Sequence, residues 1–523
     1  MVTLVREPAR PAVIREHPLA PWLAVAAVCF GAFMGQLDAS VVTVAFPALQ
    51  RQFGAGLASV QWVSLAYLLV LTALLVPAGR WSDRVGRKLM YLYGFVVFAG
   101  SSAACGLAPS LAALIALRVV QAAGAALLQA NSVALVVTSV PAPTRRAALG
   151  VQAAAQAVGL ASGPVIGGLL VAAAGWRWVF FLNVPVGVLA VVAGVYLLPR
   201  TRGLAGRPLA TPLSDAEPLT SQPPVSQSPA GQSPVSPSPV RQSPAGQRGT
   251  DPGGTVLLAV ATTTGMLAIS ALSGLGAPDW TAAVFAAVAV LAGIALFRHE
   301  RRASAPLLDL RSMAASGTSS ALLGALCAYL VLFGPLVLFP QVVSAQGGSA
   351  ESAGLLLTAL PAGFGLTAAV ADKLLPARWP NSRRCLLGGA VMAGCAAALA
   401  VPAPHAVSVV LLGLLGIGLG IYTPANNAEI MAVVPAREAA AAGGMVNMTR
   451  GTGTALGVAV VTLGLHAGAF LRSPDAGRTL SMAALAAVAL LGTGAALRGA
   501  GAVRTADGAS EAGVPQAPAE EPR

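Results

Sequence analysis

Residues 150–168, with the sequence GVQAAAQAVGLASGPVIGG, place five glycines and one proline in an otherwise apolar stretch. A glycine inside a helix costs roughly 1 kcal/mol relative to alanine, and a proline about 3 kcal/mol, so this helix requires a compensating gain. Glycines spaced four residues apart give a helix face that a second helix can approach closely in lipid. The stretch therefore predicts a helix-packing hinge formed by Gly150, Gly159, Gly163, Pro164, Gly167 and Gly168. A generic face of small residues is the plainer alternative.

The composition of the whole chain indicates a protein that crosses a membrane many times. Hydrophobic residues make up 56% of it and charged residues 10%, whereas a large soluble protein needs far more polar surface. The net charge of +13 does not indicate a nucleic-acid partner, because most Lys and Arg residues fall on one side of the predicted membrane. This bias predicts cytoplasmic N- and C-termini in the cell membrane, with four cations outside: Arg51, Arg177, Arg472 and Arg478.

Runs of about 20 apolar residues predict fourteen membrane-spanning helices. The first eight lie near residues 20–45, 59–79, 89–108, 111–139, 147–174, 178–198, 255–275 and 280–297. The last six lie near residues 318–345, 351–371, 385–402, 406–434, 440–471 and 479–497. We therefore expect a cytoplasmic tail (1–19), a six-helix bundle (20–198), two additional helices (254–297) and a second six-helix bundle (318–497).

Two polar segments complete the predicted organisation. Residues 199–253 are rich in Pro, Ser and Gln and contain the sequence QSPAGQ twice, at 227–232 and 242–247. Such a segment buries too little apolar surface to offset the entropy lost on ordering. We predict a disordered cytoplasmic linker over 199–253 and a disordered cytoplasmic tail over 498–523.

Several motifs, in order along the chain, resemble those of one family. Residues 150–168 resemble the fifth-helix motif of major facilitator superfamily exporters, and residues 175–187, GWRWVFFLNVPVG, are similar to a stretch typical of its fourteen-span drug:proton antiporters. The resemblance implies an all-α integral membrane protein with two six-helix bundles plus two extra central helices. It also implies transport by alternating access between the bundles.

The turn after the second predicted span, residues 79–88 with the sequence GRWSDRVGRK, resembles a loop motif of the same superfamily, with Trp81 in place of the usual leucine. Glycines permit a tight reversal there, and a carboxylate beside several cations can accept hydrogen bonds from Arg side chains. We interpret the turn as a conformational latch between the bundles; ordinary positive charge on the cytoplasmic side is the alternative. The latch residues would be Gly79, Asp83, Arg84, Gly86, Arg87 and Lys88.

Residues 36–47, QLDASVVTVAFP, are similar to the first-helix motif of the fourteen-span antiporters and contain the only carboxylate in the membrane segments of the first half, Asp38. A carboxyl at that depth is kept for a function or a partner. Burial disfavours its charged form, which lets it take up and release a proton. A neutral, structural Asp38 hydrogen-bonded to a neighbour is the alternative.

The fourth predicted span supplies a partner for Asp38. Residues 118–124, RVVQAAG, resemble the family motif R-x-x-Q-G-x-G, with Ala122 in place of one glycine. At about 1.5 Å of rise per residue, Asp38 and Arg118 both fall in the outer half of the membrane. We therefore expect Arg118 and Gln121 to hold Asp38 poised for proton coupling.

Further polar residues inside the predicted spans are candidates for a substrate cavity, because membrane-buried amides prefer protein or water to lipid. They are Gln129, Asn131, Gln152 and Gln156 in the first half, and Tyr422, Asn426 and Glu429 in the second. For Glu429, near the cytoplasmic end of its span, a proton role competes evenly with snorkelling to the surface. Asn447, Arg450 and Gly451 also resemble the superfamily's eleventh-helix pattern.

These features predict a proton-coupled antiporter that exports small molecules such as drugs, antibiotics or secondary metabolites. A proton-coupled importer of a small metabolite and a non-transporting membrane sensor or scaffold are the alternatives. An enzyme is not expected, because four His and two membrane carboxylates form no clustered catalytic set. The sequence contains no P-loop pattern, so we expect the proton gradient, rather than a cofactor or metal, to supply the energy.

The expected partners are the small-molecule substrate, protons and the lipid bilayer, and the expected state is a monomer. With few carboxylates in the membrane segments, the chain favours neutral, monocationic or amphipathic substrates over dicationic ones.

Deleting residues 210–248 tests the linker prediction. We expect the shortened chain to keep nearly normal transport, since a flexible linker tolerates changes in length. The measurement is substrate efflux, normalised to the amount of chain in the membrane. Loss of transport at normal expression would give the linker a direct role.

Overall fold

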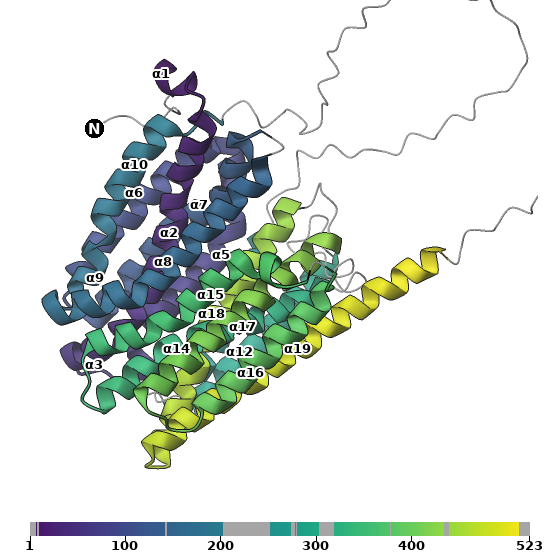
Figure 1. The fold of residues 1–523 in the computed structure, drawn as a ribbon. Coiled ribbons are helices and arrows are strands. Elements are labelled where there is room, and N and C mark those ends of the chain that lie inside the picture. Colours follow the sequence, from purple (N-terminus) through teal and green to yellow (C-terminus); the bar gives the residue numbers. More distant parts are fainter. Residues whose placement is uncertain are drawn as a thin grey trace, which may run out of the picture.

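In the computed structural model, every regular element of the described part of the chain is an α-helix, which confirms the predicted fold class (Figure 1). The structure describes residue 7 and residues 10–141, 144–201, 252–272, 278, 280–302, 318–376, 378–433 and 439–511. Most of the predicted linker therefore lies outside the described residues.

The first half of the chain forms a bundle of six long helices, drawn in purple to teal in Figure 1. They are α2 (Ala20–Val44), α5 (Trp62–Val85), α6 (Arg87–Gly106), α7 (Leu111–Ser139), α8 (Arg145–Ala174) and α10 (Asn183–Leu197). Four short helices connect or precede them: α1 (Ala12–Arg15), α3 (Phe46–Phe53), α4 (Leu57–Val60) and α9 (Arg177–Phe181).

The second half forms a bundle of six more, drawn in green to yellow beside the first (Figure 1). They are α14 (Thr318–Ala345), α15 (Ala350–Leu374), α16 (Asn381–Leu399), α17 (His405–Val433), α18 (Ala439–Phe470) and α19 (Pro474–Glu511). The last helix is longer than predicted and includes residues 498–511, which we expected in a disordered tail. This segment contains no proline, and its four alanines and two arginines favour helix against its three glycines, so the helix can continue past the last apolar turn.

Two further helices, α11 (Pro252–Leu272) and α12 (Trp280–Arg302), pack against each other. The α11 helix also contacts α5 of the first bundle and α18 of the second, so the pair lies along one seam between the bundles. A buried hydrogen bond fixes this contact: Nε2 of Gln61 donates to Oγ of Ser270 at 3.0 Å.

Twelve helices in the described part of the chain are long and apolar enough to cross a membrane. The two other predicted spans correspond to α11, whose apolar stretch Val256–Leu272 is shorter, and to the 19-residue α16. The α16 helix packs against α17 and α19, and the four polar residues with which it begins, Asn381 to Arg384, lower its mean hydropathy.

The glycine face of α8 contacts both bundles. On one side, Gly159 and Gly163 lie so close to α2 that a Cβ atom would collide with the carbonyl group of Phe33 and with Ser40. On the other side, a Cβ atom on Gly168 would lie 2.6 Å from the carbonyl oxygen of Ala350 in α15. The predicted hinge helix therefore joins the two halves along the second seam, almost backbone to backbone.

Gly150 differs from the other glycines of this motif, since a Cβ atom there would meet nothing within 4 Å. It therefore provides a matched control in the same helix. We expect Gly163→Leu to abolish the yield of folded protein, because the backbone of α2 cannot move away from a large side chain, and Gly150→Leu to leave the yield within about twofold of the parent chain. Size-exclusion chromatography of the two detergent-extracted variants measures this; equal yields would contradict the packing role of Gly163.

Candidate functional site

The centre of the first bundle holds a buried polar network around the carboxylate of Asp38. One oxygen, Oδ2, accepts a hydrogen bond from Nη1 of Arg118 at 2.6 Å. The other, Oδ1, accepts from Nε2 of Gln121 at 3.1 Å and from Nδ2 of Asn183 at 2.9 Å. All four side chains are fully buried, so the structure brings the three predicted residues together and adds a fourth.

Arg118 is held from several directions. Its Nε donates to the carbonyl oxygen of Val63 at 2.9 Å, and its Nη1 also donates to Oε1 of Gln121 at 2.8 Å. The guanidinium carbon lies 4.1 Å from the centre of the Tyr67 ring and 5.8 Å from that of Phe180. A cation over an aromatic face is attracted by the ring's electron density, most strongly where water is excluded.

This arrangement compensates the Asp38 carboxylate almost completely. An isolated buried charge costs several kcal/mol, and an ion pair repays that cost only when further hydrogen bonds satisfy both partners. Here the carboxylate has three donors and the guanidinium has two acceptors besides Asp38. Both charged side chains are therefore satisfied inside the bundle.

Asn183, at the start of α10, was missed as a site residue by the sequence analysis. Its Nδ2 also donates to Oγ of Ser102 at 3.1 Å, and that hydroxyl donates to the carbonyl oxygen of Phe180 at 2.8 Å. Gly175, with φ of +89°, ends α8 and lets the chain reverse, so that α9 and α10 return beside α6. The signal available in the sequence was a single amide inside an apolar run.

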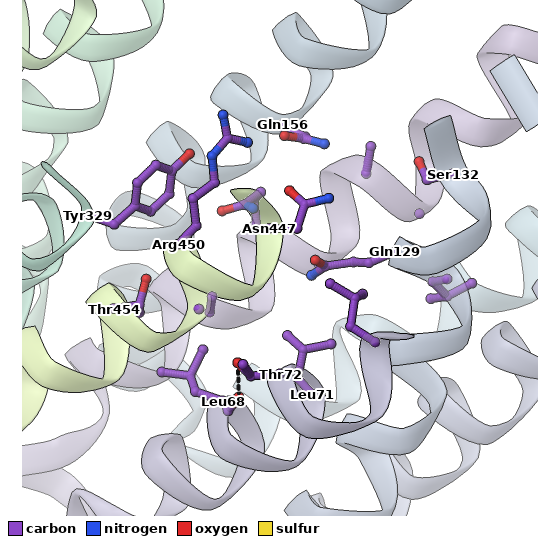
Figure 2. Close-up of a pocket in the computed structure, with 18 of the residues that line it drawn as sticks. Leu68, Leu71, Thr72, Gln129, Ser132, Gln156, Tyr329, Asn447, Arg450 and Thr454 are labelled. Carbon is purple, nitrogen blue, oxygen red and sulfur yellow. Dashed lines mark hydrogen bonds between the residues drawn. The ribbon is translucent and has the colours of Figure 1, made fainter. Parts of the chain in front are cut away.

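A cavity of about 70 Å³, enough for several water molecules, lies between the two bundles (Figure 2). Its walls come from α2, α5, α7 and α8 of the first half and from α14 and α18 of the second. Gln129, Gln152 and Gln156, all predicted for such a cavity, line it. The side chains of Gln129, Gln156, Asn447 and Arg450 point toward the same space (Figure 2).

Tyr67 links this cavity to the ion pair. It borders the cavity and also a smaller space of about 10 Å³, roughly one water molecule, that reaches Arg118. The Tyr67 hydroxyl is buried and has no hydrogen-bond partner in the described part of the chain. A water molecule in the smaller space would therefore lie between the cavity and Arg118.

Four other predicted site residues lie away from the cavity. Nδ2 of Asn131 donates to Oγ of Ser82 at 2.7 Å and ties α7 to α5, while Nδ2 of Asn426 donates to the carbonyl oxygen of Ala321 at 2.8 Å and ties α17 to α14. The Tyr422 hydroxyl donates to the carbonyl oxygen of Gly492 in α19 at 2.7 Å. Glu429 is half-buried in α17 and does not line the cavity. The hydrogen bonds of the first three connect helices within a bundle.

The structure describes part of the predicted latch. The side chain of Asp83 lies outside the described residues. Gly86, with φ of +123°, makes the turn between α5 and α6, and Arg84 is exposed. Lys88 is buried, and its Nζ donates to the carbonyl oxygens of Val195 at 2.9 Å and Leu198 at 2.7 Å, so it fastens α6 to the end of α10. Gly79 lies against Ala130 of α7.

The ion pair leads to a prediction about stability. We expect Arg118→Met to lower the apparent Tm of the detergent-solubilised chain sharply, because removing one partner of a buried pair costs about 3–5 kcal/mol. Adding Asp38→Asn should restore much of the loss, since a neutral amide needs no counter-charge. Thermal unfolding of the two variants measures the difference. If the double variant is no more stable than Arg118→Met alone, Asp38 is not charged in the folded state.

The helices, the cavity between two bundles and the buried charges define a polytopic membrane transporter. The model of the Major Facilitator Superfamily matches residues 28–246 and 252–458. The chain therefore belongs to that superfamily, as the motifs predict.

Known relatives in this superfamily differ in what their names say they transport. The chain is 32% identical to the drug efflux pump JefA of Mycobacterium tuberculosis over 84% of its own length and 79% of that protein. It is 29% identical to the methylenomycin A resistance protein of Streptomyces coelicolor, over 90% of each chain. It is 27% identical to the riboflavin transporter RibZ of Clostridioides difficile, over 84% of this chain and 87% of that one.

Among solved structures, the fold is similar to that of a bacterial homologue of the human lysosomal transporter Spinster in an inward-facing, unoccupied conformation. The TM-score is 0.59, with 94% of this chain and 98% of that chain covered, at 15% sequence identity. The likeness supports the major facilitator fold.

Proposed function

We propose that this chain is a proton-coupled antiporter that exports small molecules across the cytoplasmic membrane, with both termini in the cytoplasm. The observation that carries the proposal is the network in which the Asp38 carboxylate meets Arg118, Gln121 and Asn183. Two features support a proton role: the carboxylate is fully buried in a membrane segment, and it lies one side chain from a cavity.

In this proposal, protonation of Asp38 and binding of the substrate affect each other through Arg118. With Asp38 charged, Arg118 is occupied by the ion pair. When Asp38 takes up a proton, the guanidinium keeps only neutral partners, namely Gln121, the Val63 carbonyl and the Tyr67 ring. Arg118 is then no longer held by a negative charge and can move toward the cavity past Tyr67. This movement would couple the protonation of Asp38 to the occupancy of the substrate site.

The conformational change would occur along the glycine seam of α8 and α15. Because the two helices touch through Gly168, Gly354 and the backbone of Pro164, the bundles can rock there with few side chains to rearrange. Alternate opening of the cavity to either side would follow from that rocking. The proton gradient and the membrane potential would supply the energy, since one charge moved across 100 mV is worth about 2.3 kcal/mol.

Import is the second candidate, and one observation favours it: the relative RibZ is named for riboflavin transport. The relatives named for drug efflux and for antibiotic resistance, at similar identity and coverage, favour export. The ion pair itself fits either direction, because a proton antiporter and a proton symporter both need a titratable group.

Efflux from cells that express the chain tests the proposal. We expect export of one or more members of a panel of dyes and antibiotics, loss of that export with a protonophore, and loss of at least about tenfold in Asp38→Asn. The amide keeps the size of the side chain but removes its proton exchange. The measurement is the initial rate of fluorescence or radiolabel loss from preloaded cells.

Asp475→Asn is the matched control, since Asp475 is an exposed carboxylate in α19. It should behave like the parent chain. Unchanged, protonophore-sensitive efflux in Asp38→Asn would remove Asp38 from the proton path. Protonophore-sensitive accumulation in place of efflux would support the importer.

A further inference from the structure

The cavity between the bundles has an unbalanced charge. Among its described lining residues, Arg450 of α18 is the one with a charged side chain, and none is an Asp or Glu. The Asp38 carboxylate does not offset this cation, because Arg118 already forms its ion pair. The described walls of the cavity therefore carry a net positive charge.

Arg450 has unused hydrogen-bonding capacity. Its Nε is buried and has no hydrogen-bond partner in the described part of the chain. The guanidinium carbon lies 5.2 Å from the centre of the Tyr329 ring, which attracts the cation but accepts no strong in-plane hydrogen bond. A guanidinium presents five N–H donors in a fork that matches a carboxylate, so its planar edge is available to an oxygen-bearing ligand.

The surroundings of Arg450 combine flat apolar groups with amides. Tyr67, Tyr329 and Phe333 supply aromatic walls. Asn447 and Gln156 point toward the same space as Arg450 and offer both donors and acceptors (Figure 2). The α18 helix approaches α5 closely here, since a Cβ atom on Gly451 would lie 2.5 Å from Oγ1 of Thr72. The position of Arg450 is thus set by close helix packing.

From these contacts we infer that the substrates are aromatic organic acids, bound as anions with an acidic oxygen on the guanidinium of Arg450. The inference rests on the proposed export function and adds the class of compound. It differs from the sequence-based expectation of neutral, monocationic or amphipathic substrates, because a cationic compound would have to enter a positively charged cavity that holds no free carboxylate among its described walls. The aromatic ring would lie against Tyr329 and Phe333.

Two xanthene dyes with opposite charges test this inference: fluorescein, an anion above neutral pH, and rhodamine 123, a cation. We expect the purified full chain in detergent at pH 8 to bind fluorescein more tightly than rhodamine 123, as measured by fluorescence anisotropy. Arg450→Gln should weaken fluorescein binding about tenfold and leave rhodamine 123 binding within about twofold, since the substitution removes the charge and keeps an amide donor. Arg450→Lys should retain most of the affinity for fluorescein.

Arg51→Gln is the control for a change in overall charge, because Arg51 is an exposed cation on α3. It should bind both dyes as the parent chain does. Equal or tighter binding of rhodamine 123, no binding of fluorescein, or an equal loss for both dyes in Arg450→Gln would overturn the inference.

The same dyes separate this inference from the proposed function. Proton-driven efflux that depends on Asp38 but favours rhodamine 123 would overturn the inference and leave the export function standing. Fluorescein binding that depends on Arg450, without efflux that depends on Asp38, would support the anion site and remove the export function.

Discussion

The structure depends on the ion pair and the hydrogen bonds that stabilise one negative charge, that of Asp38, inside the apolar first bundle. The Asp38 carboxylate is fully buried, and three donors from two other helices converge on it: Arg118 and Gln121 of α7 and Asn183 of α10. Arg118 in turn donates to the backbone carbonyl of Val63 in α5. Because removing any one of these leaves a polar group without a partner in a medium that contains little water, the network fixes the relative positions of α2, α5, α7 and α10.

The two bundles use positive charge differently. In the first, Arg118 is fully buried, forms an ion pair with Asp38 and donates hydrogen bonds to Gln121 and to the Val63 carbonyl. In the second, Arg450 stacks on Tyr329 but leaves an edge toward the cavity. Asp38 thus balances the charge of Arg118, whereas no carboxylate among the described walls of the cavity balances the charge of Arg450.

Sequence patterns predicted the helices, their order and the Asp38–Arg118–Gln121 cluster. The cluster was predictable because burying a single charge in a membrane segment costs so much free energy that a carboxylate and an arginine at similar depth are expected to pair. They could not predict Asn183, Ser102 or Tyr67, since these residue types are common in helices and their roles arise from the reversal at Gly175. The roles of polar residues in the second half could not be predicted either. Tyr422 and Asn426 donate hydrogen bonds to backbone carbonyls of neighbouring helices. The sequence alone does not distinguish a polar residue that bonds to a neighbouring helix from one that lines a cavity, because the difference depends on how the helices pack. The length of α19 was underestimated because the apolar pattern ends near residue 497, whereas the helix continues to Glu511.

The glycine seam between α8 and α15 has a consequence for the rate of motion as well as for its geometry. Where two surfaces interlock through long side chains, any relative movement has to wait for many rotamers to change together. At Gly168 and Gly354 the opposing surfaces are backbone, which has no rotamers to exchange. At these two positions, therefore, no side chain has to change rotamer before α8 and α15 can shift relative to each other.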